Sequence, residues 1–409
     1  MPSSVTKLSN LVSSWINFLR RQESYFKVNI LRNLAQRFAS NLTSQYQPLY
    51  LTSLGASPLI LGYLNSISGL VNTVIAIPIG ITADRVGIKR VLIIYMLLSI
   101  VGTAIFALAY SWEVAAIALV LSSSVYVLGG TVCPMICGSL STAERVTGMG
   151  ICDTISFFPQ LIAPMVGAYL ITFFGGLNAQ GIRPLFYLQV AGLIIALGIL
   201  QFWFNNPAIQ MRSKKENIFA DIRGLFSEGH MIPRWLLLVI MASIPNQVAF
   251  YTTLFAAQVK GADQFIIGGM SVASTIVLVF FAIPLAHLSD TIGRKKVAVS
   301  AAFLSVLSYV VLIFAPNNLI LLFSGFLSGF SMSFGQNMMA ISVDLVPSYR
   351  LGSWIGFQGF CRGVVSILSP IICGYLWSFV FAESVFYFLA ATQIIAIIML
   401  ILVPYEVTR

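Results

Sequence analysis

Twelve long apolar runs, separated by short polar turns, constrain the fold of this 409-residue chain more than any other feature. Each run holds about twenty or more residues with few charges, the length that a helix rising about 1.5 Å per residue needs to cross a bilayer. Charged residues are only 9% of the chain and mean hydropathy is +0.91, whereas a soluble domain carries about 25% charged residues. The sequence therefore predicts an all-α membrane protein with twelve transmembrane helices. The runs lie at about 28–51, 58–81, 90–110, 113–138, 148–175, 184–204, 233–257, 265–288, 296–315, 317–343, 352–380 and 383–404.

A polar interval divides the runs into two sets of six. We predict a six-helix bundle over 27–204, a cytoplasmic linker over 205–232 and a second six-helix bundle over 233–409. Residues 1–26 place their apolar side chains on one helical face beside Lys and Arg, which is typical of an amphipathic helix on the cytoplasmic membrane surface.

A charged turn recurs at the same place in both sets. It ends the second run with Asp84 and, 206 positions later, the eighth run with Asp290. A glycine follows each acid, and further residues match at the same offset. Such matches indicate two pseudo-symmetric halves. The other matched pairs include Gly62 and Gly268, Pro78 and Pro284, Gly150 and Gly356, Pro164 and Pro370, and Tyr169 and Tyr375.

This turn resembles the loop signature of the major facilitator superfamily, G-x-x-x-D-R-x-G-R-[RK]. The first copy departs from it at Ile88, and the second at Ala286 and Thr291. The resemblance implies a secondary transporter that works by alternating access between two bundles. It also implies that the acid of the loop latches the halves together at the start of the eleventh span, near Gly352. The gating residues that we predict from it are Gly80, Asp84, Arg85, Gly87, Lys89, Arg90, Glu144, Asp290, Gly293, Arg294 and Lys295.

The distribution of basic residues predicts the orientation in the membrane. The net charge is +10, and 18 of the 23 Lys and Arg fall in segments that share one side, whereas Arg183 and Lys260 fall on the other. Basic loops mark the cytoplasmic face of a membrane protein. We therefore expect a multi-pass protein of the cytoplasmic membrane with both termini in the cytoplasm, and no nucleic-acid partner.

The first span carries an unusual polar face that includes Arg37, Asn41 and Gln45. A charge at the centre of a bilayer costs about 2.5–3.5 kcal/mol on insertion scales, so a lipid-facing Arg37 is unfavourable and a water-filled cavity is expected. The resemblance implies that the first, fourth, seventh and tenth spans line this cavity. The remaining substrate-binding candidates are Asn246, Gln247, Tyr251, Gln336, Asn337 and Arg362.

Two further charged residues within the spans each allow two interpretations of the chemistry of the cavity. Asp153 in the fifth span could carry a proton for coupling or could neutralise Arg37. Arg362 in the eleventh span could bind an anionic substrate group or pair with Asp153. Because Arg32, Arg37 and Arg362 outnumber the acids within the spans, the cavity is predicted to favour polar or anionic solutes. The stretch 163–168 resembles a degraded G-P-x-x-G-G antiporter motif, which favours export.

Composition also excludes other classes of protein. No G-x-x-x-x-G-K-[ST] phosphate loop is present, which argues against an ATP-driven pump. Five Cys and two His show no metal-ligand spacing, so we expect no enzyme, no metal and no cofactor. We expect a monomeric transporter of a small organic solute, with protons as a candidate coupling ion. The alternatives are a multidrug-type efflux antiporter for amphipathic compounds and a membrane sensor or scaffold that does not transport.

Overall fold

The computed structural model describes residues 20–86, 88–123, 145–204, 231–346 and 351–403, and their regular structure is entirely helical. The first half contains α2 (Ser24–Thr43), α3 (Gln47–Ser53), α4 (Pro58–Val86), α5 (Ile88–Leu108), α7 (Arg145–Phe173) and α8 (Ala179–Trp203). The second half contains α10 (Met231–Gln247), α11 (Phe250–Gln258), α12 (Gln264–Ile276), α13 (Ala282–Ile292), α14 (Arg294–Phe314), α15 (Asn318–Ser328), α16 (Phe330–Asp344), α17 (Leu351–Tyr375) and α18 (Ala382–Leu402). The N-terminal segment 1–26, apart from its last residues, and most of the linker 205–232 lie outside the described residues.

Eight of the described helical spans are long and apolar enough to cross a membrane, and a ninth is counted if α10 and α11 form one broken span. The remaining three predicted spans fall short for identifiable reasons. The polar face of α2 lowers the hydropathy of the first span, and the fourth span is described only over Trp112–Ser123. In α7, only Phe157–Phe173 is counted as an apolar helix.

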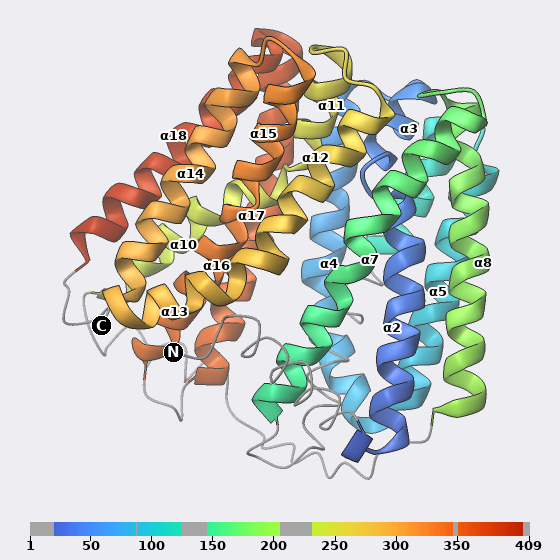
Figure 1. Ribbon diagram of the computed structural model, residues 1–409, viewed down its shortest axis with the longest axis horizontal. Coiled ribbons are helices and arrows are strands. Elements are labelled where there is room, and N and C mark those ends of the chain that lie inside the picture. Colours follow the sequence, from blue (N-terminus) through green and yellow to red (C-terminus); the bar gives the residue numbers. More distant parts are fainter. Residues whose placement is uncertain (1–19, 87, 124–144, 205–230, 347–350, 404–409) are drawn as a thin grey trace, which may run out of the picture.

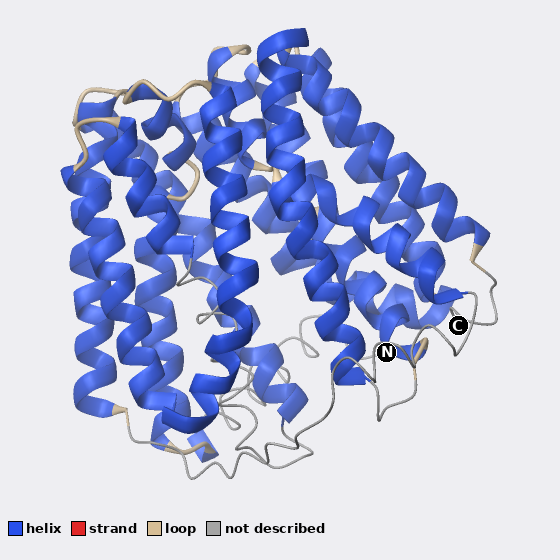
Figure 2. Cartoon of the chain, turned by 180° about the vertical axis from the view of Figure 1, so that it is seen from behind, coloured by secondary structure: helices blue, strands red, loops and turns tan. Residues whose placement is uncertain are grey.

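The helices form two bundles that lie side by side (Figure 1). Across the boundary, α4 packs along α17 and α7 packs along α12, while α3 contacts α11. The bundles meet at the end that carries α3 and α11, which we call the closed end. They diverge toward the other end, which we call the open end, and the reverse view shows the same arrangement (Figure 2).

Breaks in the first and seventh spans shape the closed end. The first span ends its long helix at Thr43 and restarts at Gln47, and Pro48 suits the first turn of the new helix. The seventh span bends by 41° between α10 and α11. The breaks turn α3 and α11 toward each other and place a tyrosine at the start of each.

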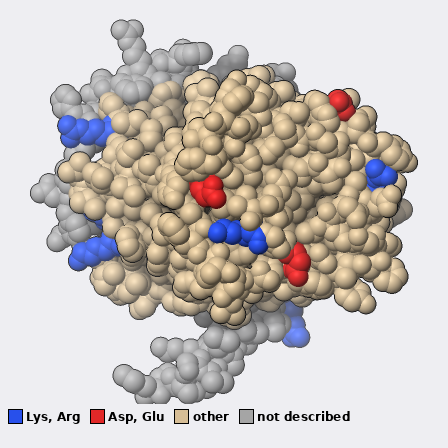
Figure 3. Space-filling view, turned by 90° about the horizontal axis from the view of Figure 1, so that it is seen from above, with Lys and Arg blue, Asp and Glu red and all other residues tan. Residues whose placement is uncertain are grey.

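Polar caps start several helices at this end. Asn178, Asp263 and Asn317 each accept a backbone N–H from the first turn of α8, α12 and α15, at 2.8, 2.8 and 3.1 Å. Such caps satisfy N–H groups that have no partner within the helix. Figure 3 shows that few charged side chains lie on the described surface of the closed end.

Candidate functional site

Three adjoining cavities lie between and within the two halves. The largest, about 1020 Å³, is lined mainly by α4 and α17, with Gln47, Gln247 and residues of 112–123. A second of about 470 Å³ lies between α10, α16 and α17 and shares Gln247 and Arg362 with the first. A third of about 530 Å³ shares Asn246 and Ser331 with the second. These shared residues make the three cavities one candidate binding region.

Arg362 is the charged residue among the described residues that line this region, and it borders two of the three cavities. Its position in α17, half-way along the span, puts the guanidinium far from both helix ends. A guanidinium carries five N–H donors and matches carboxylate or phosphate geometry. The rest of the lining is mostly hydroxyl, amide and apolar, so the region suits a polar solute with one anionic group.

Four more predicted substrate-binding residues lie in this lining. Gln45 lines the third cavity, and Asn246 lines the second and third. Gln247 lines the first and second, and Gln336 lines the second.

The other predicted candidates lie elsewhere in the structure. The side chain of Arg37 is exposed and lines none of the three cavities, and the Asn41 amide donates to the Arg37 carbonyl at 2.8 Å. Asn337 is buried inside the second half, where it accepts from Ser289 at 2.5 Å. Tyr251 is fully buried at the closed end. The Asp153 side chain lies outside the described part of the structure.

The second span also contributes to this lining, and its residues were not among the predicted ones. Asn65, Ser68 and Asn72 of α4 line the largest cavity opposite α17. Their spacing of three and four residues puts them on one helical face, and this polar stripe in an apolar run was a visible signal. On the facing helix α17, a Cβ on Gly356 or Gly359 would meet nothing within 4 Å, whereas Gly363 allows the close approach of Thr73 of α4.

The motif turn is described best in its second copy. Gly293 adopts φ of 100°, a conformation that favours glycine, and it joins α13 to α14. Arg294 pairs with Asp344 at the end of α16, whereas Asp290 is exposed. The offset of 206 places Ile88 and Gly138 at the corresponding positions of the first half, so these two residue types are not repeated there.

The lysines of the two turns make equivalent contacts. Lys89 donates to the Gln201 carbonyl at 3.2 Å, in the last turn of α8. Lys295, 206 positions later, donates to the Ile401 carbonyl at 2.9 Å and to that of Val403, at the end of α18. A cation there satisfies carbonyls that have no partner in the helix and offsets the negative end of its dipole. The side chains of Asp84 and Arg85, and all of Gly87 and Glu144, lie outside the described residues, whereas Gly80 lies within α4.

Two tyrosines join the halves at the closed end. The Tyr46 hydroxyl lies 2.9 Å from the Pro164 carbonyl of α7 and 3.1 Å from the Gln264 carbonyl of α12. The Tyr251 hydroxyl lies 2.9 Å from the Pro58 carbonyl of α4 and 3.5 Å from that of Pro370 in α17. Each tyrosine therefore has one acceptor in its own half and one in the other.

Comparison with known proteins identifies the family. The family model "Major Facilitator Superfamily" matches residues 33–280 and 250–409. The chain belongs to the major facilitator superfamily. It is 28% identical over 291 residues to multidrug resistance protein MdtG of Enterobacter lignolyticus, a match that covers 66% of this chain and 65% of that protein.

Solved structures agree with this fold. The nucleoside transporter NupG superimposes with a TM-score of 0.72 at 16% identity, covering 92% of this chain and 98% of that one. A D-xylose–proton symporter gives 0.72 at 15% identity, covering 92% and 96%. The all-α membrane fold and the family resemblance predicted from the sequence are thus confirmed, and the chain is a multi-pass membrane protein of a family of transporters, not of enzymes.

Proposed function

We propose that this protein is a secondary transporter that moves a small polar or anionic organic solute across the membrane by alternating access. The observation that carries the proposal is the polar region around Arg362, which lies between two halves that are closed at one end. A site shared by two bundles can face either side in turn when the bundles rock about it.

The proposed orientation follows from the described basic residues. Lys89 and Arg90 begin α5, and Arg294, Lys295 and Lys296 begin α14, at the open end. Because basic residues gather on the cytoplasmic side, the open end faces the cytoplasm and the closed end faces outward. Both termini are then cytoplasmic, and the structure corresponds to an inward-facing state.

Export of amphipathic compounds is the second candidate function. It is favoured by the multidrug resistance proteins among the relatives and by aromatic side chains in the lining, among them Phe250, Phe334 and Phe360. Under either function, Asp153 is the candidate for proton coupling. If so, Asp153→Asn abolishes flux driven by an imposed pH gradient but preserves exchange.

Counterflow in proteoliposomes tests the proposal. Organic anions, neutral sugars and nucleosides, and lipophilic cations are first screened for a rise in the melting temperature of the purified protein, because a ligand stabilises the state that binds it. Vesicles are then loaded with an unlabelled hit, and labelled hit is added outside. We expect a transient overshoot of label inside. A compound that stabilises the protein, yet enters no faster than into protein-free vesicles, would contradict transport and support a sensor or scaffold.

A further inference from the structure

The two tyrosines at the closed end belong to a repeated contact. Pro164 and Pro370 differ by 206 positions, as do Pro58 and Gln264, and Tyr46 and Tyr251 differ by 205. The acceptors of Tyr46, the carbonyls of Pro164 and Gln264, are therefore the counterparts of those of Tyr251, the carbonyls of Pro370 and Pro58. The pseudo-symmetry that relates the two halves therefore also relates the Tyr46 contact to the Tyr251 contact.

Glycines bring the backbones together at the same two places. A Cβ on Gly268 of α12 would lie 2.8 Å from the Tyr46 hydroxyl and 2.9 Å from the Pro164 carbonyl. A Cβ on Gly62 of α4 would lie 2.4 Å from the Pro370 carbonyl and 3.0 Å from the Tyr251 hydroxyl. Both distances to backbone oxygen are too short for a side chain, so each glycine is needed for its helix to approach the other half.

The geometry points to a pair of symmetry-related latches that hold the closed end shut, one made by Tyr46, Pro164 and Gly268 and the other by Tyr251, Pro370 and Gly62. This assignment rests on the proposed function and gives the two tyrosines a role in setting the conformational equilibrium. Opening the closed end separates α7 from α12 and α4 from α17, so it breaks the bond that each hydroxyl makes across the boundary.

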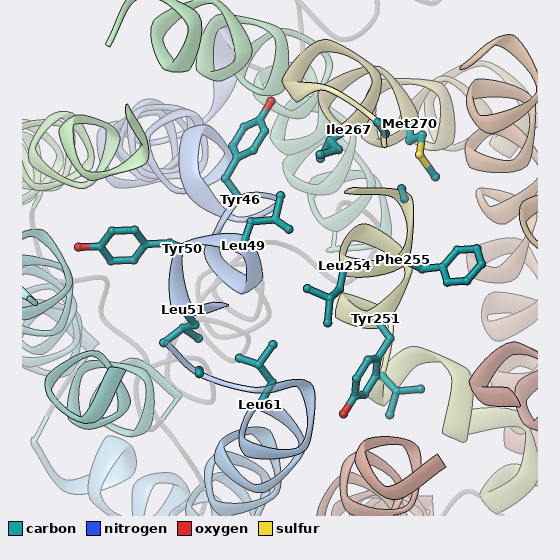
Figure 4. Packing of buried hydrophobic residues seen from close by; sticks show 14 of the residues in the cluster. Tyr46, Leu49, Tyr50, Leu51, Leu61, Tyr251, Leu254, Phe255, Ile267 and Met270 are labelled. Carbon is teal, nitrogen blue, oxygen red and sulfur yellow. The ribbon is translucent and has the colours of Figure 1, made fainter. Parts of the chain in front are cut away.

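The latches consist of hydrogen bonds, which are directional, and both lie buried from solvent. Both tyrosine side chains are 0% exposed and belong to the apolar cluster that joins the halves. In Figure 4 their rings point away from each other within this cluster. Opening removes the acceptor across the boundary and leaves each hydroxyl the acceptor in its own half, whereas phenylalanine fits the same space and makes neither bond. Replacing tyrosine by phenylalanine therefore weakens the closed state with little loss of packing.

Tyr50 provides a matched control. It is also fully buried on α3, but its hydroxyl lies 3.0 and 3.1 Å from the carbonyls of Phe106 and Ala109, both in its own half. Its ring points away from the second half (Figure 4). The hydroxyl also accepts from Nε of Arg183 at 3.2 Å, likewise in the first half, so Tyr50→Phe removes buried hydrogen bonds without touching the boundary.

The test is a distance measurement at the closed end. Spin labels replace Phe173 at the end of α7 and Phe379 beyond α17, which are 75% and 71% exposed, in a variant without the five native cysteines. Double electron–electron resonance then reports the separation of the halves. Tyr46→Phe and Tyr251→Phe should each raise the ratio of long to short distances roughly two- to ten-fold, and the double variant should raise it further. Tyr50→Phe should match the parent.

Glycine variants test the same latches with the tyrosines intact. Gly268→Ala and Gly62→Ala should also populate the long distance, whereas Gly198→Ala on α8, where a Cβ meets nothing within 4 Å, should not. Unchanged distances in the double tyrosine variant and in both glycine variants would contradict the proposal that these contacts hold the closed end shut. Counterflow by the parent protein is measured separately, so a failure of the latches is distinct from a failure of transport.

Discussion

At the scale of single residues, the central cation of the candidate site is Arg362. The first-span residue Arg37 was the stronger candidate from sequence, yet its side chain is exposed and lines none of the three cavities of the candidate region. Arg32, on the same helix, is buried and donates to Asn29 at 2.9 Å and to Gln36 at 2.8 Å. We therefore propose that Arg362 recognises an anionic group of the solute.

Arg362→Ala should abolish the stabilisation of the protein by organic anions and their counterflow, because the lining then has no described cation. Arg362→Lys should retain part of both, since an ammonium keeps the charge but loses the two-pronged geometry. Arg37→Ala is the control and should retain counterflow. Melting curves with and without each anion measure binding. If Arg37→Ala reduced anion binding and counterflow as much as Arg362→Ala does, the first span would also be part of the binding site.

At the scale of helices, the motif turn ties neighbouring helices together within each half. Lys89 joins the start of α5 to the end of α8, and Lys295 joins the start of α14 to the end of α18. In the second half, Arg294 with Asp344 also joins α14 to α16. These contacts connect helices within each bundle at the open end, as rocking of whole bundles would require.

Lys295→Met should lower the melting temperature of the purified protein by about 1 °C, because carbonyls at the end of α18 lose a charged donor worth about 0.3–1 kcal/mol. Lys89→Met should act in the same direction at the end of α8. Lys296→Met is the matched control, since this neighbouring lysine is exposed and makes no described hydrogen bond. If Lys296→Met lowered the melting temperature as much as Lys295→Met, the stabilisation would come from the net charge of this region rather than from the hydrogen bonds of Lys295.

At the scale of the whole molecule, hydropathy and internal repeats were sufficient to predict the two-bundle fold, because spans and offsets are periodic along the chain. The residues that line the cavities were predicted only in part. Gln247 and Arg362 were found as polar residues in apolar runs, but the stripe of Asn65, Ser68 and Asn72 was passed over. The role inferred for Tyr251 in holding the closed end shut could not be predicted from the neighbouring sequence, since its hydrogen-bond acceptor Pro58 is 193 positions away. Such contacts depend on how the halves pack.

The most direct test of alternating access compares distances at both ends of the same variants. A second spin-label pair replaces Phe202 at the end of α8 and Leu402 at the end of α18, which are 82% and 74% exposed and lie at the open end. In the double Tyr46→Phe, Tyr251→Phe variant, the account predicts that the Phe173–Phe379 distance lengthens while the Phe202–Leu402 distance shortens. Lengthening at the closed end with no shortening at the open end would contradict the account.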